Sequence, residues 1–256
     1  MKKIIAFLLV LVMMLGITAC APTTTDTPSS SSSEQTPPAS TVMTHAQYLA
    51  AEEAAPVEIE AYVQATQSWW DNKIVVYAQD KIGGYIAYNL SCTEEEAAKL
   101  VPGTKINIKG FKTFYKGMPE IAEGATFTVV EGADTYIAPA EIMTDLLGKK
   151  ELIDKVGVLG AFNGLTIKSI SYKNDAPGDD IYVDFTLGEA TYSFCVERYL
   201  TDPDTEVYKA FAELKAGDVV DVQGFVYWYD ADVEPGVASE NAYAINTHIT
   251  KVTKVG

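Results

Sequence analysis

An internal repeat constrains the fold of this chain more than any other feature of its sequence. Residues 103–111 read GTKINIKGF, and residues 217–225 read GDVVDVQGF. In each copy a turn glycine is followed by strict alternation of apolar and polar residues, and the copy ends in Gly-Phe. Alternation with a period of two places the apolar residues of each copy on one buried face of a β-strand. The glycine before the aromatic residue predicts a bulge or a sharp bend in that strand.

The segments around the two copies follow one another in the same order. A short helix is predicted before each copy, at residues 93–100, where Thr93 can act as the N-cap, and at 202–214, where Asp202 can do so. Strands are predicted before these helices at 57–65, 73–79 and 85–90 in the first half, and at 155–162, 165–172, 180–187 and 190–196 in the second. Closing strands are predicted near 126–131 and 248–255, and helical lead-ins at 45–54 and 139–147.

Three strands, a helix and two further strands is the element order of the OB-fold, a five-stranded Greek-key barrel. The sequence also resembles this family, because residues 102–121 and 216–230 look like two copies of its strand 4–loop–strand 5 segment. The resemblance covers residues 44–256, and this segment is similar to tandem domains that occur in bacterial lipoproteins. The motifs of the resemblance are structural and identify no ligand. We therefore predict an all-β chain with short helices, made of two tandem OB-fold-like five-stranded Greek-key barrels. An immunoglobulin-like sandwich is the alternative, and the two mid-domain helices argue against it.

The N-terminus predicts export and attachment to a membrane. Two lysines precede an apolar stretch at residues 4–17, which is shorter than the roughly 20 residues of a membrane-spanning helix. Residues 17–20 read ITAC and resemble the bacterial lipobox, which implies that Cys20 is acylated and becomes the mature N-terminus. The alternative is an ordinary signal peptide followed by a chance cysteine. The expected location is therefore extracytoplasmic, with the chain lipid-anchored (palmitate) to the cell membrane.

The segment after Cys20 predicts a flexible tether. Residues 21–40 are rich in Ser, Thr and Pro, and alanine is their only apolar residue type, so this segment cannot bury enough surface to fold. A flexible chain of this length has a root-mean-square reach of about 25 Å. The predicted organisation is a signal peptide at 1–19, the lipidated cysteine and disordered linker at 20–40, a first barrel at 41–135 and a second at 136–256.

The charge of the chain restricts its expected partners. The formal net charge is −16 at pH 7, and Arg198 is the single arginine. An acidic surface repels phosphate backbones, and arginine is the side chain preferred for phosphate recognition. The composition therefore argues against nucleic acid as a partner, and a glycan, a peptide or an envelope protein is expected instead.

Two cysteines remain besides Cys20. We expect Cys92 and Cys195 to be independent buried thiols, with a disulfide as the alternative that an exported protein permits.

Aromatic residues gather where an OB-fold takes its ligand, which is across strands 2 and 3 and between the 1–2 and 4–5 loops. Exposed aromatic side chains at such places can stack on sugars or bases. Adjacent residues of a strand point to opposite faces, so at least one of two adjacent tryptophans is expected to pack inward and plug the barrel. The candidate ligand-binding residues are Trp69, Trp70, Tyr77, Tyr88 and Tyr115 in the first barrel and Trp228 and Tyr229 in the second.

Motifs of catalysis and of metal binding are missing from the sequence. It contains no nucleophile elbow, no phosphate-binding glycine loop and no Cys/His metal spacing, and the acidic loop at 230–241 departs from the EF-hand pattern. We therefore predict no catalytic residue, no metal and no cofactor. The predicted function is that of a non-catalytic extracytoplasmic binding or adaptor lipoprotein for a glycan, a peptide or a partner protein. The alternatives are a lipoprotein that binds single-stranded nucleic acid and a structural envelope protein without a small ligand.

Overall fold

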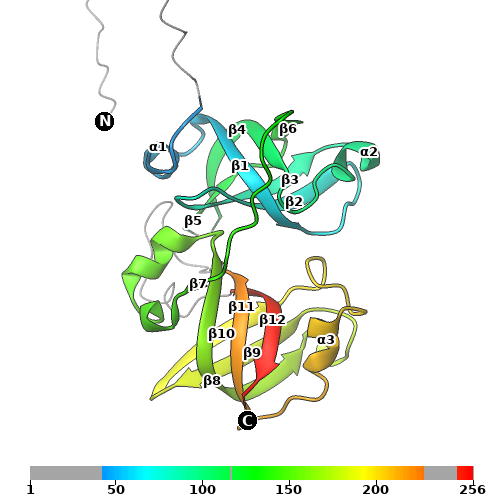
Figure 1. The fold of residues 1–256 in the computed structure, drawn as a ribbon. Helices are drawn as coiled ribbons and strands as arrows, with labels where there is room; N and C mark the ends of the chain where they lie inside the picture. Colours follow the sequence, from blue (N-terminus) through cyan, green and yellow to red (C-terminus); the bar gives the residue numbers. More distant parts are fainter. Residues whose placement is uncertain (1–41, 116, 228–246, 256) are drawn as a thin grey trace, which may run out of the picture. The chain divides into compact units, whose positions relative to one another are not determined.

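The computed structural model describes residues 42–115, 117–227 and 247–255, which are mostly β-sheet with short helices (Figure 1). The predicted signal peptide, Cys20, the linker, Trp228, Tyr229 and the acidic loop lie outside the described residues. Within the described ranges, no helix has both the length and the apolar content that crossing a membrane requires.

The first barrel contains β1 (Pro56–Thr66), β2 (Lys73–Gln79), β3 (Gly84–Ser91), β4 (Lys105–Tyr115), β5 (Met118–Ile121) and β6 (Thr126–Val129). Its strands pair in the order β1-β2-β3-β5-β4, and β4 pairs back with β1 to close the barrel. The strand that we predicted near 126–131 is present as β6, but its predicted role as the closing strand is wrong. The strand β5 closes the barrel, and β6 only adds to the edge of β4. All four residues of β5 are buried, whereas β6 alternates exposed and half-buried residues.

The second barrel contains β7 (Glu141–Ile142), β8 (Leu159–Tyr172), β9 (Ile181–Leu187), β10 (Ala190–Val196), β11 (Val219–Phe225) and β12 (His248–Lys254). The order β8-β9-β10-β12-β11, closed by the pairing of β11 with β8, repeats the order of the first barrel. The two strands predicted at 155–162 and 165–172 form one long strand, β8. The first part of β8 pairs with β11 and its last part pairs with β9, so one strand forms hydrogen bonds with both neighbouring strands. The predicted pair of five-stranded OB-like barrels is confirmed.

The helices are α1 (His45–Ala50), α2 (Glu94–Ala97) and α3 (Glu206–Ala210). Thr93 caps α2 as predicted, with Glu96 completing a capping box. The N-cap of α3 is Thr205 and not Asp202, because the Asp202 carboxylate accepts the backbone N–H of Asp204 in a turn before the helix.

The predicted helical lead-in at 139–147 is wrong. The predicted range contains β7 and the 3₁₀ helix η1 (Thr144–Leu146), and a second 3₁₀ helix, η2 (Lys150–Lys155), follows it. Gly148 lies between them with a φ of +76°, in the left-handed region, where an α-helix cannot continue.

The repeated strands β4 and β11 carry the buried faces that their alternation predicts. Ile106 and Ile108 in the first, and Val220 and Val222 in the second, are fully buried. The strand glycines act differently in the two barrels. The register shifts before Gly224, which confirms a bulge there, whereas Gly110 pairs with β1 without a shift. A Cβ atom at position 110 would lie 2.7 Å from the Cβ of Ala125, so Gly110 permits a close approach instead.

The two cysteines in the described residues are buried and free. Cys92 lies just after β3, and Cys195 lies in β10. Burial raises the pKa of both thiols, most strongly that of Cys195. The expectation of two independent buried thiols is confirmed.

Candidate functional site

The outer face of β2 and β3 is where an OB-fold takes its ligand, and the second barrel covers part of it here. Strand alternation turns Val75 and Tyr77 of β2 and Ile86 of β3 away from the first barrel's own core. These three side chains pack in one buried cluster with Phe225 and Ile249 of the second barrel. The second barrel therefore covers this part of the face and shares a hydrophobic core with it.

Tyr77 lies in the middle of this shared core with 0% of its surface exposed. Its ring stacks on Phe225 with 4.7 Å between the centroids. Gln67 donates to the Tyr77 hydroxyl at 3.1 Å, and that hydroxyl lies 2.6 Å from Nδ1 of His248. Burial raises the pKa of Tyr77 and lowers the pKa of His248 to about 3, so both groups are neutral near pH 7. Tyr77 is thus removed from the candidate ligand-binding surface, because the second barrel buries it.

Backbone contacts also hold the two barrels together. A Cβ atom added to Gly84 would lie 2.2 Å from the carbonyl carbon of Gly157, so the two chain segments touch at a distance that only glycine permits. Nearby, Leu159 donates its N–H to the side-chain oxygen of Gln79 at 3.0 Å. The two barrels are therefore in direct contact. A site at this seam, where the two barrels meet, is lined by residues of both.

The uncovered part of the face forms a groove of about 590 Å³ at this seam. Its volume falls in the range of small-molecule sites, roughly 300–1,000 Å³. The groove is lined by Gln67, Ser68, Trp69, Trp70, Lys73, Ile74, Val75, Tyr88 and Asn89 of the first barrel and by Arg198, Tyr199 and Asp202 of the second.

A tight turn between β1 and β2 positions the first wall of the groove. Trp70 and Lys73 exchange two backbone hydrogen bonds, at 3.0 and 2.9 Å. Asp71 and Asn72 between them have φ values of +47° and +60°. Positive φ at both central positions is typical of a type I′ turn, in which Asp and Asn are well tolerated. The turn fixes Trp70 at the edge of the groove.

The two adjacent tryptophans have different roles. Trp69 is half-buried, packs against the core of the first barrel and donates its indole N–H to the carbonyl oxygen of Cys92 at 3.0 Å. Trp70 is 72% exposed. The expectation that at least one tryptophan packs inward is confirmed by Trp69, and Trp70 remains available for stacking.

Three exposed aromatic side chains face this groove. Besides Trp70 they are Tyr88 of β3, 43% exposed, and Tyr199 of the second barrel, 53% exposed. Of the predicted residues, the groove therefore contains Trp69, Trp70 and Tyr88. Tyr115 lies at the end of β4, exposed but outside the groove lining.

The two cations of the groove differ in their partners. Lys73 forms an ion pair with Glu123, which raises the pKa of the lysine, and Asn89 donates to the same carboxylate at 3.3 Å. Arg198 forms no ion pair with any residue that the structure describes, and its guanidinium lies 5.2 Å from the centroid of the Tyr199 ring. The groove can therefore stack planar rings and bind an anion at Arg198.

Sequence reasoning missed Arg198 and Tyr199 as site residues. They follow β10 in the second barrel, in a position that no rule for a single OB barrel assigns to a ligand site. Only the packing of the second barrel on β2 and β3 brings them to the groove. The signal that could have found Arg198 is its status as the single arginine of the chain.

Groups for metal chemistry are not gathered in the described part of the chain. Within those residues, no cluster of three or more His, Cys, Asp or Glu side chains could hold a metal ion. The side chains of the groove are aromatic, amide, hydroxyl and charged groups, which suit recognition by stacking and hydrogen bonding.

No protein-family model matches the chain, and no curated protein matches it. Solved structures similar to it include a murine DNA-binding protein bound with double-stranded DNA, with 13% identity, a TM-score of 0.36 and coverage of 78% of this chain and 96% of that one. A replication protein A heterotrimer bound to single-stranded DNA has 11% identity, a TM-score of 0.31 and coverage of 68% and 45%. An asparaginyl-tRNA synthetase from Entamoeba histolytica has 17% identity and a TM-score of 0.27, and the match spans 38% of this chain and 20% of the synthetase. The likeness is one of fold alone.

One expectation about partners is wrong. We expected the acidic composition to argue against nucleic acid, but net charge does not decide this question, and structures of similar fold include proteins bound to DNA. Net charge is a sum over the whole chain, whereas a ligand responds to the local groove, which contains the single arginine.

Proposed function

We propose that this chain is a lipid-anchored, non-catalytic binding protein whose groove takes a single-stranded segment of nucleic acid. The observation that carries the proposal is the presence in one groove of three exposed aromatic rings and of Arg198, which forms no ion pair with any described residue. The groove lies on the part of the OB face that the second barrel leaves open. Bases stack on aromatic side chains in such grooves without strong sequence preference, and a cation contacts the backbone.

The size and charge of the protein limit the kind of binding that we expect. A groove of about 590 Å³ suits a few nucleotides better than a long strand. The net charge of −16 repels the remaining phosphates, so the affinity is expected to be modest and to fall as salt rises.

The N-terminal sequence supports the anchor in this proposal. In the lipobox-like motif at 17–20, Cys20 is the residue that would carry the acyl chain, and 21–40 would tether the barrels to the outer side of the membrane. Cys20→Ala should abolish incorporation of labelled palmitate and release the protein from the membrane fraction of cells. Palmitate labelling equal to that of the parent would contradict the anchor, and leaves the proposed ligand untouched.

Trp70→Ala should weaken binding of a short oligo-dT by about tenfold. Loss of one base–aromatic stack costs roughly 1–3 kcal/mol, and each 1.4 kcal/mol corresponds to a factor of ten. Fluorescence anisotropy of a labelled oligonucleotide at low salt measures the change. Tyr182→Ala is the matched control, because Tyr182 is an exposed aromatic residue of β9 outside the groove lining.

Two results would overturn the proposed ligand. The first is the absence of oligonucleotide binding by the parent protein at low salt. The second is saturable quenching of tryptophan fluorescence by oligosaccharides together with no response to oligonucleotides. That second result would instead support the glycan ligand that the sequence led us to expect.

A further inference from the structure

A turn of the second barrel, residues 197–201, reaches the groove on the first barrel. The backbone N–H of Ser68, in the 1–2 loop of the first barrel, donates to the carbonyl oxygen of Tyr199 at 2.7 Å. The Ser68 hydroxyl donates to the same oxygen at 3.3 Å. These hydrogen bonds fix the turn against the loop that carries Trp70, so its side chains have a defined place in the groove.

Hydrogen bonds from the other residues of this turn to Glu197 stabilise it. The carboxylate of Glu197 accepts the backbone N–H of Leu200 at 2.8 Å. Its carbonyl oxygen accepts the backbone N–H and the hydroxyl of Thr201, both at 2.9 Å. A turn closed by these bonds has little freedom to move, so the two side chains between Glu197 and Leu200 are presented in a preorganised way.

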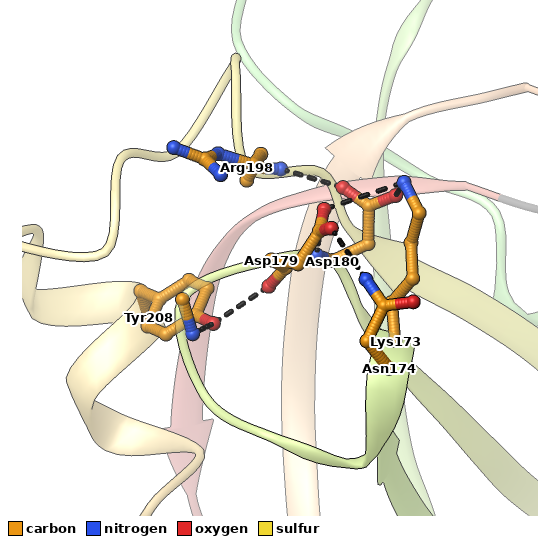
Figure 2. Close-up of polar contacts among 7 residues, drawn as sticks. Lys173, Asn174, Asp179, Asp180, Arg198 and Tyr208 are labelled. Atoms are coloured by element: carbon orange, nitrogen blue, oxygen red, sulfur yellow. Dashed lines mark hydrogen bonds and ion pairs between the residues drawn. The ribbon is translucent and has the colours of Figure 1, made fainter.

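Asp180 lies in the 1–2 loop of the second barrel and also stabilises the turn (Figure 2). One carboxylate oxygen accepts the backbone N–H of Arg198 at 3.1 Å, and the other lies 3.1 Å from Nζ of Lys173. Asp179 also pairs with Lys173, at 3.3 Å. Lys173 thus neutralises charge at both aspartates, and Asp180 contacts the backbone of Arg198.

Among the described residues the guanidinium of Arg198 forms no ion pair, although its charge contributes to lowering the pKa of Asp179. Figure 2 shows the Arg198 side chain directed away from the two aspartates. Within the described ranges it pairs with no carboxylate, and it lies half-buried beside the ring of Tyr199. The planar guanidinium matches a phosphate group with two parallel hydrogen bonds, so an anion of this shape is the ligand group that fits.

We propose that residues 197–201 form a recognition arm that completes the groove, in which Arg198 binds a phosphate group of the ligand and Tyr199 stacks beside it. Glu197 and Asp180 are positioning residues that hold the arm. This inference rests on the proposed function and deepens it, because it makes the second barrel part of the site and names a phosphate next to a planar ring as the unit recognised.

Arg198→Gln tests the phosphate contact in the full-length protein. Binding of a labelled oligo-dT is measured by anisotropy over a range of NaCl concentrations. Affinity at low salt should fall about tenfold, as expected for loss of a hydrogen-bonded charged contact. The slope of log K against log salt should become shallower by about 0.7, because one phosphate contact on a single strand releases about 0.7 counterion.

Two further variants separate charge from geometry. Arg198→Lys should keep the salt slope but bind more weakly than the parent, because lysine lacks the planar fork. Lys251→Gln removes the same charge from an exposed site on β12 outside the groove lining, and should leave affinity and slope unchanged. Inorganic phosphate should compete with the oligonucleotide for the parent and not for Arg198→Gln.

A pair of substitutions at Glu197 tests its positioning role. Glu197→Ala removes the side-chain acceptor of the Leu200 N–H and leaves it only the Glu197 carbonyl oxygen, at 3.1 Å. The variant should therefore lower affinity and flatten the salt slope, in the same direction as Arg198→Gln. Glu197→Gln keeps a side-chain oxygen there and should restore both. Failure of Gln to restore them would show that Glu197 does not act through this hydrogen bond.

The failures of the two proposals can be distinguished. A parent that binds oligo-dT while Arg198→Gln retains the same affinity and salt slope overturns the recognition arm and leaves the proposed function intact. A parent that binds no oligonucleotide at low salt overturns both. Phosphate that competes equally against the parent and Arg198→Gln also overturns the assignment of Arg198.

Discussion

Replacing Tyr77 by alanine is expected to lower the free energy of unfolding by about 3–5 kcal/mol. The substitution removes a fully buried ring from the shared core and with it the stack on Phe225. It also leaves Nδ1 of His248 without the Tyr77 hydroxyl as its partner, in a place where burial makes an unpaired polar atom costly. Urea denaturation followed by circular dichroism measures the change.

Matched variants identify the cause of this loss. Tyr77→Phe keeps the ring and removes the hydroxyl, and should cost about 1–3 kcal/mol. Tyr88→Ala removes the same side chain from the neighbouring strand, where it is partly exposed, and should cost less than about 1 kcal/mol. A loss below 1 kcal/mol for Tyr77→Ala would contradict the packing of the second barrel on β2 and β3.

A pH-dependent stability is expected from Glu120 of β5. Its side chain is buried, with only 4% of the residue exposed, and within the described residues its Oε2 has no hydrogen-bond partner. Desolvation raises the pKa of this carboxyl to about 8. The folded state therefore keeps a proton that the unfolded chain releases above about pH 4.5. This stabilising contribution is complete below about pH 4.5 and is lost as pH rises to about 8.

The loss across this range is expected to be on the order of 4 kcal/mol. Free energies of unfolding are measured in urea from pH 5 to pH 8 for the parent and for Glu120→Gln. The parent should lose stability relative to Glu120→Gln as pH rises, because glutamine has no proton to release. The range ends at pH 8 because desolvation lowers the pKa of buried Lys112 to about 8, and its titration acts in the opposite direction above that value.

The control for this experiment is Glu95→Gln, which removes a carboxylate from an exposed position on α2. Its stability curve should run parallel to that of the parent over the same pH range. A constant difference between the parent and Glu120→Gln from pH 5 to pH 8 would show that the Glu120 carboxylate is not desolvated in the folded protein.

Much of the fold was predictable from local patterns. The bounds predicted for β2 and β10 agree with the structure to the residue, because alternation and flanking turn residues define a strand locally. Thr93 was predicted as a cap for the same reason. The closing strand of the first barrel was misassigned because β5 has only four residues, too few for alternation to distinguish it from the neighbouring β6.

The candidate site was predictable only in part. Trp70 and Tyr88 were found because the OB-fold assigns its ligand to a known face of the barrel. Tyr77 was assigned to the same surface because alternation shows that it points outward, and alternation carries no information on what covers it. Arg198 was read only as evidence against a nucleic-acid ligand, although it lies in the groove.

The sequence by itself determined the two barrels, their strand periodicity, the Thr93 cap of α2 and the aromatic character of the first 1–2 loop. These are properties of neighbouring residues, which the backbone geometry of strands and turns constrains directly. Only the tertiary structure decided that the second barrel covers Tyr77 and that Arg198 and Tyr199 lie in the open groove. The physical reason is that burial of one surface by another depends on the complementarity of two surfaces formed by residues more than a hundred positions apart in the chain.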